Sequence, residues 1–316
     1  MKKSLAYLVL LAAVLVVPLV THVNYFIHLA VLSFIFMIVA QGLNVIQGYT
    51  GYVSIAQGAF MGVGAYASAL LSIRLGIPAW ACLVIAPLVT ALSAVIAGYP
   101  SLRVKGHYFA IVTLALNMVV FTVLVNWISM TGGEPGLPGV PPLESIHIGD
   151  YVFKSGKRQN FYYIAIAALL LCQGAVFLVM RSRVGQVLQA IRQNEMFVES
   201  LGVSVWHYKL FAFVFSAWMA GFAGALYAHY MGFISPTPFS VDASLNAILA
   251  VIMGGSGTLA GPLLGGALTI LLPEVLRVAE IYRLAIYGVI LILIVIYLPK
   301  GLVPALGSVC TRLRKA

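Results

Sequence analysis

Side chains that could perform acid–base, nucleophilic or metal chemistry are few in this chain. Of its 316 residues only eight are acidic and six are histidine. One cluster combines both kinds, Glu134, Glu144, His147 and Asp150, within the stretch 129–160. The Gly- and Pro-rich sequence TGGEPGLPGVPP near its start predicts turns and extended chain, so a solvated loop explains the cluster better than an active site. We therefore expect that the chain is not an enzyme and that it has no metal or cofactor site.

Uncharged polar side chains form a second group, at helical spacing inside an apolar region. Gln41 and Asn44 lie three residues apart, and Ser54 and Gln57 repeat that spacing. Between the pairs, the sequence Gly48-Tyr49-Thr50-Gly51 should interrupt the helix. A glycine break at membrane depth is tolerated only where protein covers it or where it lines a cavity.

A second glycine-rich break occurs in the other half of the chain. It is the sequence GGSGTLAGPLLGG, whose first two residues are Gly254 and Gly255. In another apolar run, Thr113 and Asn117 lie four residues apart. Broken segments in two halves are typical of transporters with a solute path near the middle of the membrane. The predicted path is lined by Gln41, Asn44, Gly51, Ser54, Gln57, Thr113, Asn117, Gly254 and Gly255. Helix–helix hydrogen bonding is the alternative role for each of these polar side chains.

The elements that must position these groups are membrane helices. Hydrophobic residues make up 62% of the chain and charged residues 8%, whereas about a quarter of the residues in soluble domains are charged. The apolar runs are continuous rather than alternating, which favours helices over a barrel. We expect an all-α integral membrane protein, a polytopic bundle of about 8–10 transmembrane helices with re-entrant or broken segments.

The candidate spans are the apolar runs 5–22, 25–46, 53–73, 79–99, 107–128, 160–180, 209–231 and 281–298. The first resembles a signal peptide, but no small-x-small cleavage pattern follows it, so we expect a retained span. The region 243–275 holds two short apolar pieces split by glycines. They form either a re-entrant hairpin or two short helices, and both return the chain to the same side.

The charges divide unevenly between the two sides that these spans define. With the N-terminus inside, twelve of the 18 basic residues and two of the eight acidic residues fall on the inner side, a net charge of +10, and the outer side sums to zero. The positive-inside tendency therefore places both termini and the stretch 181–209 in the cytoplasm, and 129–160 outside. Because the basic residues follow the topology, they do not indicate nucleic-acid binding.

The polar stretch 181–209 separates two apolar runs and has an apolar stripe of its own. Apolar residues recur at helical spacing at Val184, Val187, Leu188, Ile191, Val198 and Leu201. They predict one short amphipathic helix over 184–201, with Arg192, Glu195 and Glu199 on its remaining surface and Gly202 as a left-handed stop. A helix that docks into another protein needs such a stripe. An ordinary loop between spans is the alternative.

Any energy source for transport must lie outside this chain. It contains no Gly-x-x-x-x-Gly-Lys-Ser/Thr nucleotide loop, and no acidic residue precedes Glu134. An ion-coupled transporter usually needs an ionisable group within the membrane, and the sequence offers no good one. If the chain pumps a solute, energy would enter through the stretch 181–209.

Several stretches together resemble the permease subunits of branched-chain amino acid ABC importers, of the LivM type. They cover most of the chain: GLNVIQGYTGYVSIAQGAFMGVGAYASALL (42–71), YFAIVTLALN (108–117), TGGEPGLPGVPP (131–142), the whole of 181–228, AVIMGGSGTLAGPLLGGAL (250–268) and LPKGL (298–302). The sequence Glu199-Ser200-Leu201-Gly202 stands where this family has Glu-Ala-Leu-Gly, within a loop whose coupling helix seats in the ATPase.

The resemblance implies a single permease domain over 1–316 in the bacterial inner membrane, with a periplasmic loop at 129–160 and a cytoplasmic coupling loop at 181–209. The implied partners are a sister permease in a heterodimer, two cytoplasmic ABC ATPases and a periplasmic solute-binding protein. The residues expected to couple to the ATPase are Ile191, Arg192, Glu195, Glu199 and Gly202. The expected solutes are branched-chain or other apolar amino acids. Urea and short-chain amide importers use similar permeases, which leaves those solutes as the alternative.

Overall fold

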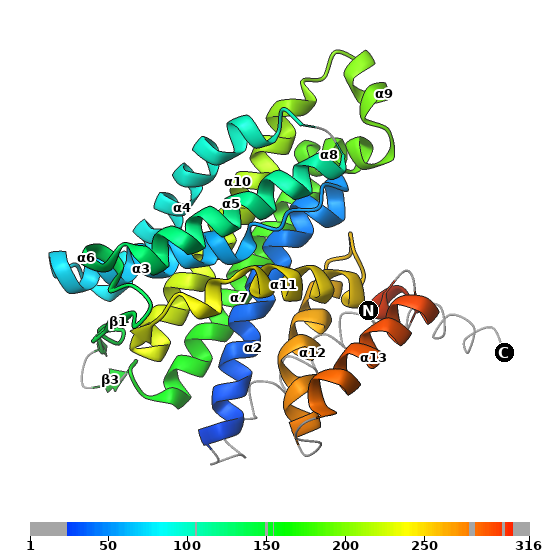
Figure 1. Ribbon diagram of the computed structural model, residues 1–316. Coiled ribbons are helices and arrows are strands. Elements are labelled where there is room, and N and C mark those ends of the chain that lie inside the picture. The colour runs from blue at the N-terminus through cyan, green and yellow to red at the C-terminus, as the bar shows by residue number, and fades with distance from the viewer. Residues whose placement is uncertain are drawn as a thin grey trace.

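The computed structural model describes residues 24–104, 106–148, 151–153, 155–277, 282–298 and 301–305, and helices dominate these ranges (Figure 1). The longer helices are α2 (Asn24–Leu43), α3 (Gln57–Leu75), α4 (Ala79–Ser101), α5 (His107–Asn126), α7 (Arg158–Arg181) and α10 (Val205–Met231). The shorter ones are η1 (Asn44–Gly48), α6 (Ile128–Thr131), α8 (Arg183–Gln193), α9 (Glu195–Ser200), η2 (Thr237–Phe239), α11 (Val241–Gly254), α12 (Gly261–Val275) and α13 (Arg283–Tyr297). Two antiparallel pairs of short strands join β1 (Leu137–Pro138) to β4 (Phe233–Ile234), and β2 (Ile146–Ile148) to β3 (Tyr151–Phe153).

The predicted all-α membrane bundle is confirmed. Within the described residues, 6 helices are long and apolar enough to cross a membrane, counting α2 together with η1, and shorter apolar helices follow in α11, α12 and α13. The expected span 5–22 and both chain termini lie outside the described residues. The chain is therefore a multi-pass membrane protein.

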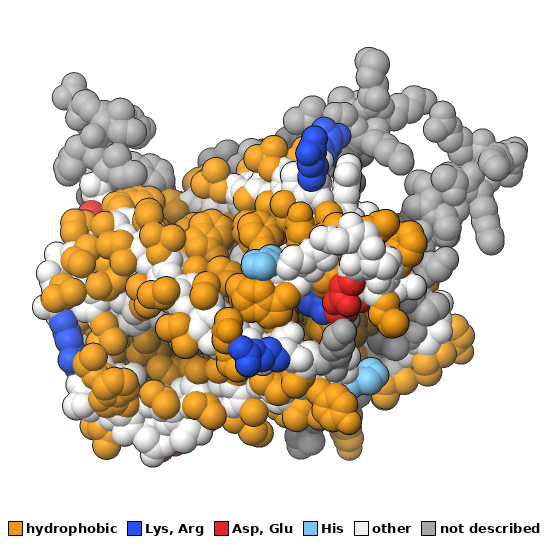
Figure 2. Space-filling model, turned by 90° about the horizontal axis from the view of Figure 1, so that it is seen from above, with side chains coloured by type: hydrophobic (Ala, Val, Ile, Leu, Met, Phe, Trp, Pro, Cys, Tyr) orange, Lys and Arg blue, Asp and Glu red, His pale blue; other side chains and the backbone are white. Residues whose placement is uncertain are grey.

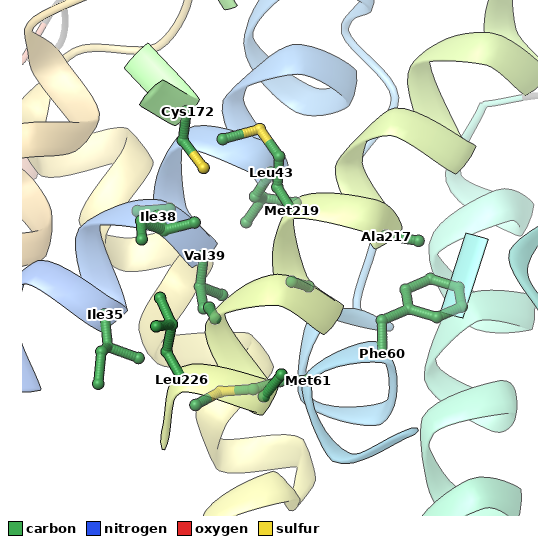
Figure 3. Close-up of a cluster of buried hydrophobic side chains, with 14 of the residues drawn as sticks. Ile35, Ile38, Val39, Leu43, Phe60, Met61, Cys172, Ala217, Met219 and Leu226 are labelled. Carbon is green, nitrogen blue, oxygen red and sulfur yellow. The ribbon is translucent and has the colours of Figure 1, made fainter. Parts of the chain in front are cut away.

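The core forms where α10 packs between α2 and α3, and glycines bring α10 and α3 into backbone contact. A Cβ atom on Gly64 would collide with the backbone of Gly221, and one on Gly224 would collide with the carbonyl oxygen of Met61. Small residues permit this approach, which provides the close packing that holds membrane helices together. Figure 3 shows Met61 of α3 and Leu226 of α10 in the buried cluster, with Val39 of α2 nearby.

Contacts between distant segments define two ends of the bundle. At one end, β1 pairs with β4, and the Trp80 indole N–H donates to the Glu144 carbonyl oxygen at 3.0 Å. Helix α2 also starts at this end, where the Tyr25 hydroxyl donates to the Glu274 carboxylate. The other end carries α8 and α9, which stand at the top of Figure 1. Figure 2 views the molecule from above and shows mainly hydrophobic side chains with a few charged ones among them.

The region 243–275 forms two short helices, α11 and α12, which was one of the two predicted alternatives. The two helices cover different parts of the length of the bundle. The segment before α12 bonds to Asn44 near the end of α2, whereas Glu274 near the end of α12 contacts Tyr25 at the start of α2. The loop and α12 therefore run along the whole of α2. Ser244, in the first turn of α11, accepts a hydrogen bond from Asn117 in the middle of α5. This contact shows that α11 begins halfway along the bundle. The broken segments expected from the glycines are present.

Two predicted boundaries were wrong. The third predicted span begins at Gln57 rather than at residue 53, so Ser54 lies in a segment without regular structure. Helix α10 begins at Val205 rather than at residue 209, so the loop between α7 and α10 ends earlier and Lys209 lies inside the helix. Burial of Lys209 beside an acidic partner explains how a lysine is tolerated there, since buried charges occur when they are paired.

Candidate functional site

The first break begins where α2 passes into the π-helical turn η1. Gly51 has a φ of +81°, which favours glycine, and residues 51–56 form no regular structure. A Cβ atom on Gly48 would lie 2.6 Å from the backbone nitrogen of Gly257. The first break therefore lies directly against the second, although 209 positions in the sequence separate the two glycines.

The second break follows α11, and Asn44 fastens it to the first. Gly255 has a φ of +120°, and a Cβ atom on Gly254 would collide with the carbonyl oxygen of Gly261. The Asn44 side chain donates to the Thr258 carbonyl oxygen at 2.9 Å and accepts from the Gly257 N–H at 2.9 Å. Because the Asn44 amide of η1 makes both of these bonds to the second break, the two breaks form one hydrogen-bonded unit.

Helix α5 supplies hydrogen bonds that the broken backbone lacks. The Thr113 hydroxyl accepts from the Ile55 N–H at 3.0 Å, and the Asn117 side chain donates to the Ile55 carbonyl oxygen at 3.0 Å. Asn117 also reaches Ser244 at 2.6 Å, and the Ser244 hydroxyl accepts from the Gly58 N–H at 2.8 Å. These bonds are what an interrupted helix requires in a membrane, where water cannot satisfy the backbone.

The remaining polar side chains of the predicted path are buried as well. Gln41 bonds to Gln173, and Gln57 donates to the Ser216 hydroxyl. Among the described residues of the predicted path, four buried side-chain oxygens lack a hydrogen-bond partner: Gln41 Oε1, Ser54 Oγ, Gln57 Oε1 and Asn117 Oδ1. In this conformation these side chains are covered by protein and many hold neighbouring segments together, so their role as a solute path stays a prediction.

The predicted single helix over 184–201 was wrong, because two helices, α8 and α9, cover this region. They meet at Asn194, whose backbone is extended with φ −160° and ψ 103°. The Asn194 side chain accepts from the Phe197 N–H at 3.0 Å and so caps α9. Asparagine competes with helical backbone bonding in this way and favours the start of a helix over its interior.

The change of direction at Asn194 turns most of the predicted apolar stripe inward. Leu188, Ile191 and Val198 are buried, and Ile191 and Val198 pack against Val205 at the start of α10. Exposed apolar side chains lie on the outward side of α9 and just after it, and we call them the α9 surface: Met196, Phe197 and, from the predicted stripe, Leu201, with exposed fractions of 76%, 61% and 66%. Glu199 is exposed beside it. Gly202 takes the expected left-handed conformation, with a φ of +78°.

Glu195 points into the molecule and joins a buried charged group. Its carboxylate pairs with the Lys209 ammonium and accepts from the Tyr52 hydroxyl at 2.6 Å. Lys209 donates to the Tyr52 oxygen at 2.6 Å and lies 4.2 Å from the centre of the Tyr52 ring. Burial, followed by the hydrogen bond to Glu195, raises the pKa of the Tyr52 phenol above its ordinary value, so the hydroxyl keeps its proton.

Arg192, the neighbouring charged residue of α8, points toward the two breaks. Its guanidinium donates to the Gly48 carbonyl oxygen, at the end of η1. A Cβ atom on Gly257 would collide with this guanidinium, and one on Gly51 would lie 3.5 Å from the Arg192 side chain. Arg192 therefore connects the loop between α7 and α10 directly to both breaks.

Sequence reasoning missed Tyr52 and Lys209, and it missed Met196 and Phe197 of the α9 surface. The available signal was Asn194, a favourable N-cap residue directly before Glu195, which restarts the helical phase. No sequence signal pairs Tyr52 with Lys209, because their contact depends on the packing of distant segments. Within the described residues, no group of three or more His, Cys, Asp or Glu side chains could hold a metal ion.

Comparison with known proteins places these features in a family. The model of the family described as branched-chain amino acid transport system / permease component matches residues 25–295. The permease protein LivM of the high-affinity branched-chain amino acid transport system of Salmonella typhimurium is 33% identical over 296 residues, covering 88% of this chain and 70% of the relative. LivH of the Escherichia coli K12 system is 26% identical over 289 residues, covering 84% and 90%.

A permease protein of Pseudomonas aeruginosa, BraD, is 23% identical over 292 residues, covering 84% of this chain and 91% of the relative. No solved structure matches the chain significantly. The family match spans the helices that form both breaks, the α9 surface and the buried group around Lys209. The chain therefore belongs to the family of branched-chain amino acid transport system permease components.

Proposed function

We propose that the chain is a transmembrane permease subunit of an ATP-driven importer for branched-chain or other apolar amino acids. The named relatives are permease proteins of branched-chain amino acid transport systems, and they include both LivM and LivH proteins. The likeness to both supports a heterodimer of this chain with a sister permease. Two cytoplasmic ABC ATPases and a periplasmic solute-binding protein complete the proposed importer, which resides in the bacterial inner membrane. ATP hydrolysis belongs to the partner chains, and this chain is not an enzyme.

The α9 surface is the observation that carries the proposal. Three large apolar side chains are exposed on and just after a helix of 6 residues, at one end of the bundle rather than along its sides. The inner side of the same loop is already packed against α10, so the outward side is free for a partner. A short helix with exposed apolar side chains fits a groove in another protein. Glu199, beside these side chains, adds a charge that can orient the contact.

Charge supports a cytoplasmic position for this end. Among the described residues, Arg103, Arg181, Arg183 and Arg192 lie at or near the end that carries α8 and α9. At the opposite end, the described part of the stretch 129–160 carries Lys157 and Arg158, whose charges Glu134 and Glu144 offset. Since basic residues concentrate on the cytoplasmic side, α9 faces the ATPases and the strand-bearing loop faces the binding protein.

The two breaks provide the moving part of the proposed mechanism. Their backbone is already free of continuous helical bonding, so a change in angle there needs no helix to unwind. The four unpartnered oxygens of the predicted path supply polar atoms beside these segments. When the ATPases close, movement of α9 shifts the two breaks and opens the polar cluster toward one side or the other, while the binding protein selects the solute.

Transport in reconstituted vesicles tests this function. The purified permease pair and ATPases are placed in liposomes with the binding protein, and uptake of radiolabelled leucine is followed with and without ATP. We expect ATP-dependent uptake that survives when ion gradients are collapsed. Uptake that needs an ion gradient but no ATP would instead identify a secondary transporter. Urea or a short amide outcompeting leucine would identify the alternative solute class.

A further inference from the structure

Besides the apolar packing of Ile191 and Val198, the loop between α7 and α10 contacts the rest of the chain through two charged side chains. Arg192, in the last turn of α8, reaches the Gly48 carbonyl oxygen. Glu195, the first residue of α9, reaches Tyr52 and Lys209. Only Asn194, with its extended backbone, separates the two side chains in the sequence. Both therefore respond to a movement of the same short segment.

We infer that Arg192, Glu195, Lys209 and Tyr52 form a latch that transmits the movement of α9 to the two breaks, separately from the surface that binds the ATPase. The inference rests on the proposed function. In this arrangement Arg192 and Glu195, which the sequence suggested as ATPase contacts, act toward the membrane side instead. Tyr52 and Lys209 are positioning residues that neither the solute nor the ATPase touches.

Burial makes the Glu195–Lys209 contact firm enough to transmit a displacement. The Lys209 side chain is 5% exposed and the Glu195 side chain 19%. Charges shielded from water interact more strongly and are screened less by salt than charges on the surface. The Tyr52 hydroxyl bridges both partners, and the Lys209 ammonium also lies over its ring. Separating α9 from Tyr52 would expose or unpair charged groups, so these groups move together.

The two breaks also move together once the latch moves one of them. Tyr52 lies within the first break, one residue after Gly51, and Arg192 touches the first break at Gly48 and the second at Gly257. Asn44 adds two hydrogen bonds of 2.9 Å between the first break and the second. A displacement of α9 is therefore delivered to both halves of the chain rather than to one.

The latch makes a prediction that a purely structural role does not make. Its loss should leave the ATPases bound and hydrolysing ATP while solute movement falls. The test uses the reconstituted complex with Tyr52→Phe, which removes the bridging hydroxyl and keeps the ring, and with Arg192→Met, which removes the donor and keeps a long side chain. Tyr66→Phe is the matched control for the first, because the buried Tyr66 hydroxyl has no partner within the described residues. Arg183→Met, at an exposed position of α8, is the control for the second.

For each variant, the retained ATPase, the rate of ATP hydrolysis and the leucine taken up per ATP are measured. We expect normal ATPase retention, hydrolysis at half the normal rate or better, and on the order of a ten-fold loss of uptake per ATP, within the range of known couplings between sites. Both controls should match the unaltered complex.

Wild-type uptake per ATP in both latch variants would overturn the inference, and so would loss of bound ATPase, which would mean that these contacts only shape the α9 surface. A failure of the latch leaves uptake by the unaltered complex intact. A failure of the proposed function abolishes that uptake, so the two failures are distinguishable.

Discussion

Replacement of Lys209 by methionine tests whether the buried charged group stabilises the protein as its geometry indicates. Lys209 is almost fully buried, and methionine preserves most of its volume while removing the charge. Removing one partner of a buried ion pair costs about 3–5 kcal/mol, because the other charge stays buried without its partner. Here Glu195 keeps 19% exposure and the hydrogen bond from Tyr52, so we expect about 3 kcal/mol, the lower limit.

Replacing Glu195 instead of Lys209 should lower the free energy of unfolding by a larger amount. Glu195→Met leaves an ammonium that is 5% exposed without its carboxylate, so we expect a loss near the upper limit, about 5 kcal/mol. The double variant with methionine at both positions contains no unpaired charge and should recover to within about 1–2 kcal/mol of the unaltered protein. The free energy of unfolding is measured by SDS titration in mixed micelles. Equal losses in the two single variants, or additive losses in the double variant, would refute this account of the pair.

Three further tests are proposed. Gly265→Ala should lower the free energy of unfolding by roughly 1–3 kcal/mol, because its Cβ atom would collide with the Ala250 carbonyl oxygen. Gly174→Ala in α7 is the control: nothing lies within 4 Å of its Cβ atom, so the free energy of unfolding should rise by about 0.5–1 kcal/mol. Phe197→Asp should release the ATPases during purification while the permease pair stays assembled; retention of both would show that another surface binds them. A single cysteine at Gln193, in a cysteine-free background, should react with an impermeant thiol reagent only in inverted vesicles, and labelling from outside would reverse the topology.

The fold could be predicted because its main signals are local in the sequence. Long apolar runs specify helices in a membrane, where each helix satisfies its own backbone. The two breaks were visible for a similar reason, since Gly51 and Gly255 adopt positive φ values that favour glycine. Thr113 and Asn117 were found as polar exceptions in an apolar helix, and they do bond to the first break. Their spacing alone does not distinguish contact with a solute from hydrogen bonding to the backbone of a neighbouring segment.

The loop between α7 and α10 was harder because a single residue changes which face is buried. The apolar pattern of 184–201 reads as one continuous stripe, yet Asn194 ends α8 and restarts the helix in a new direction. Leu188 and Ile191 are then covered by this chain, while Phe197 is left exposed. A pattern gives the period of a helix but not the point at which a capping side chain outcompetes the next backbone hydrogen bond.

The charged residues of this loop show why a motif position alone does not give a role. Glu195 and Glu199 lie four residues apart in the same loop, yet Glu195 bonds inward to Lys209 and Glu199 remains exposed. Their different surroundings follow from Tyr52 and Lys209, which packing brings together from segments 157 positions apart. Substitutions at Glu199 should therefore act on partner binding and substitutions at Glu195 on transmission. If the proposed latch operates, ATPase binding at Glu199 and transmission at Glu195 are two separate steps, and treating the two residues as equivalent would merge them.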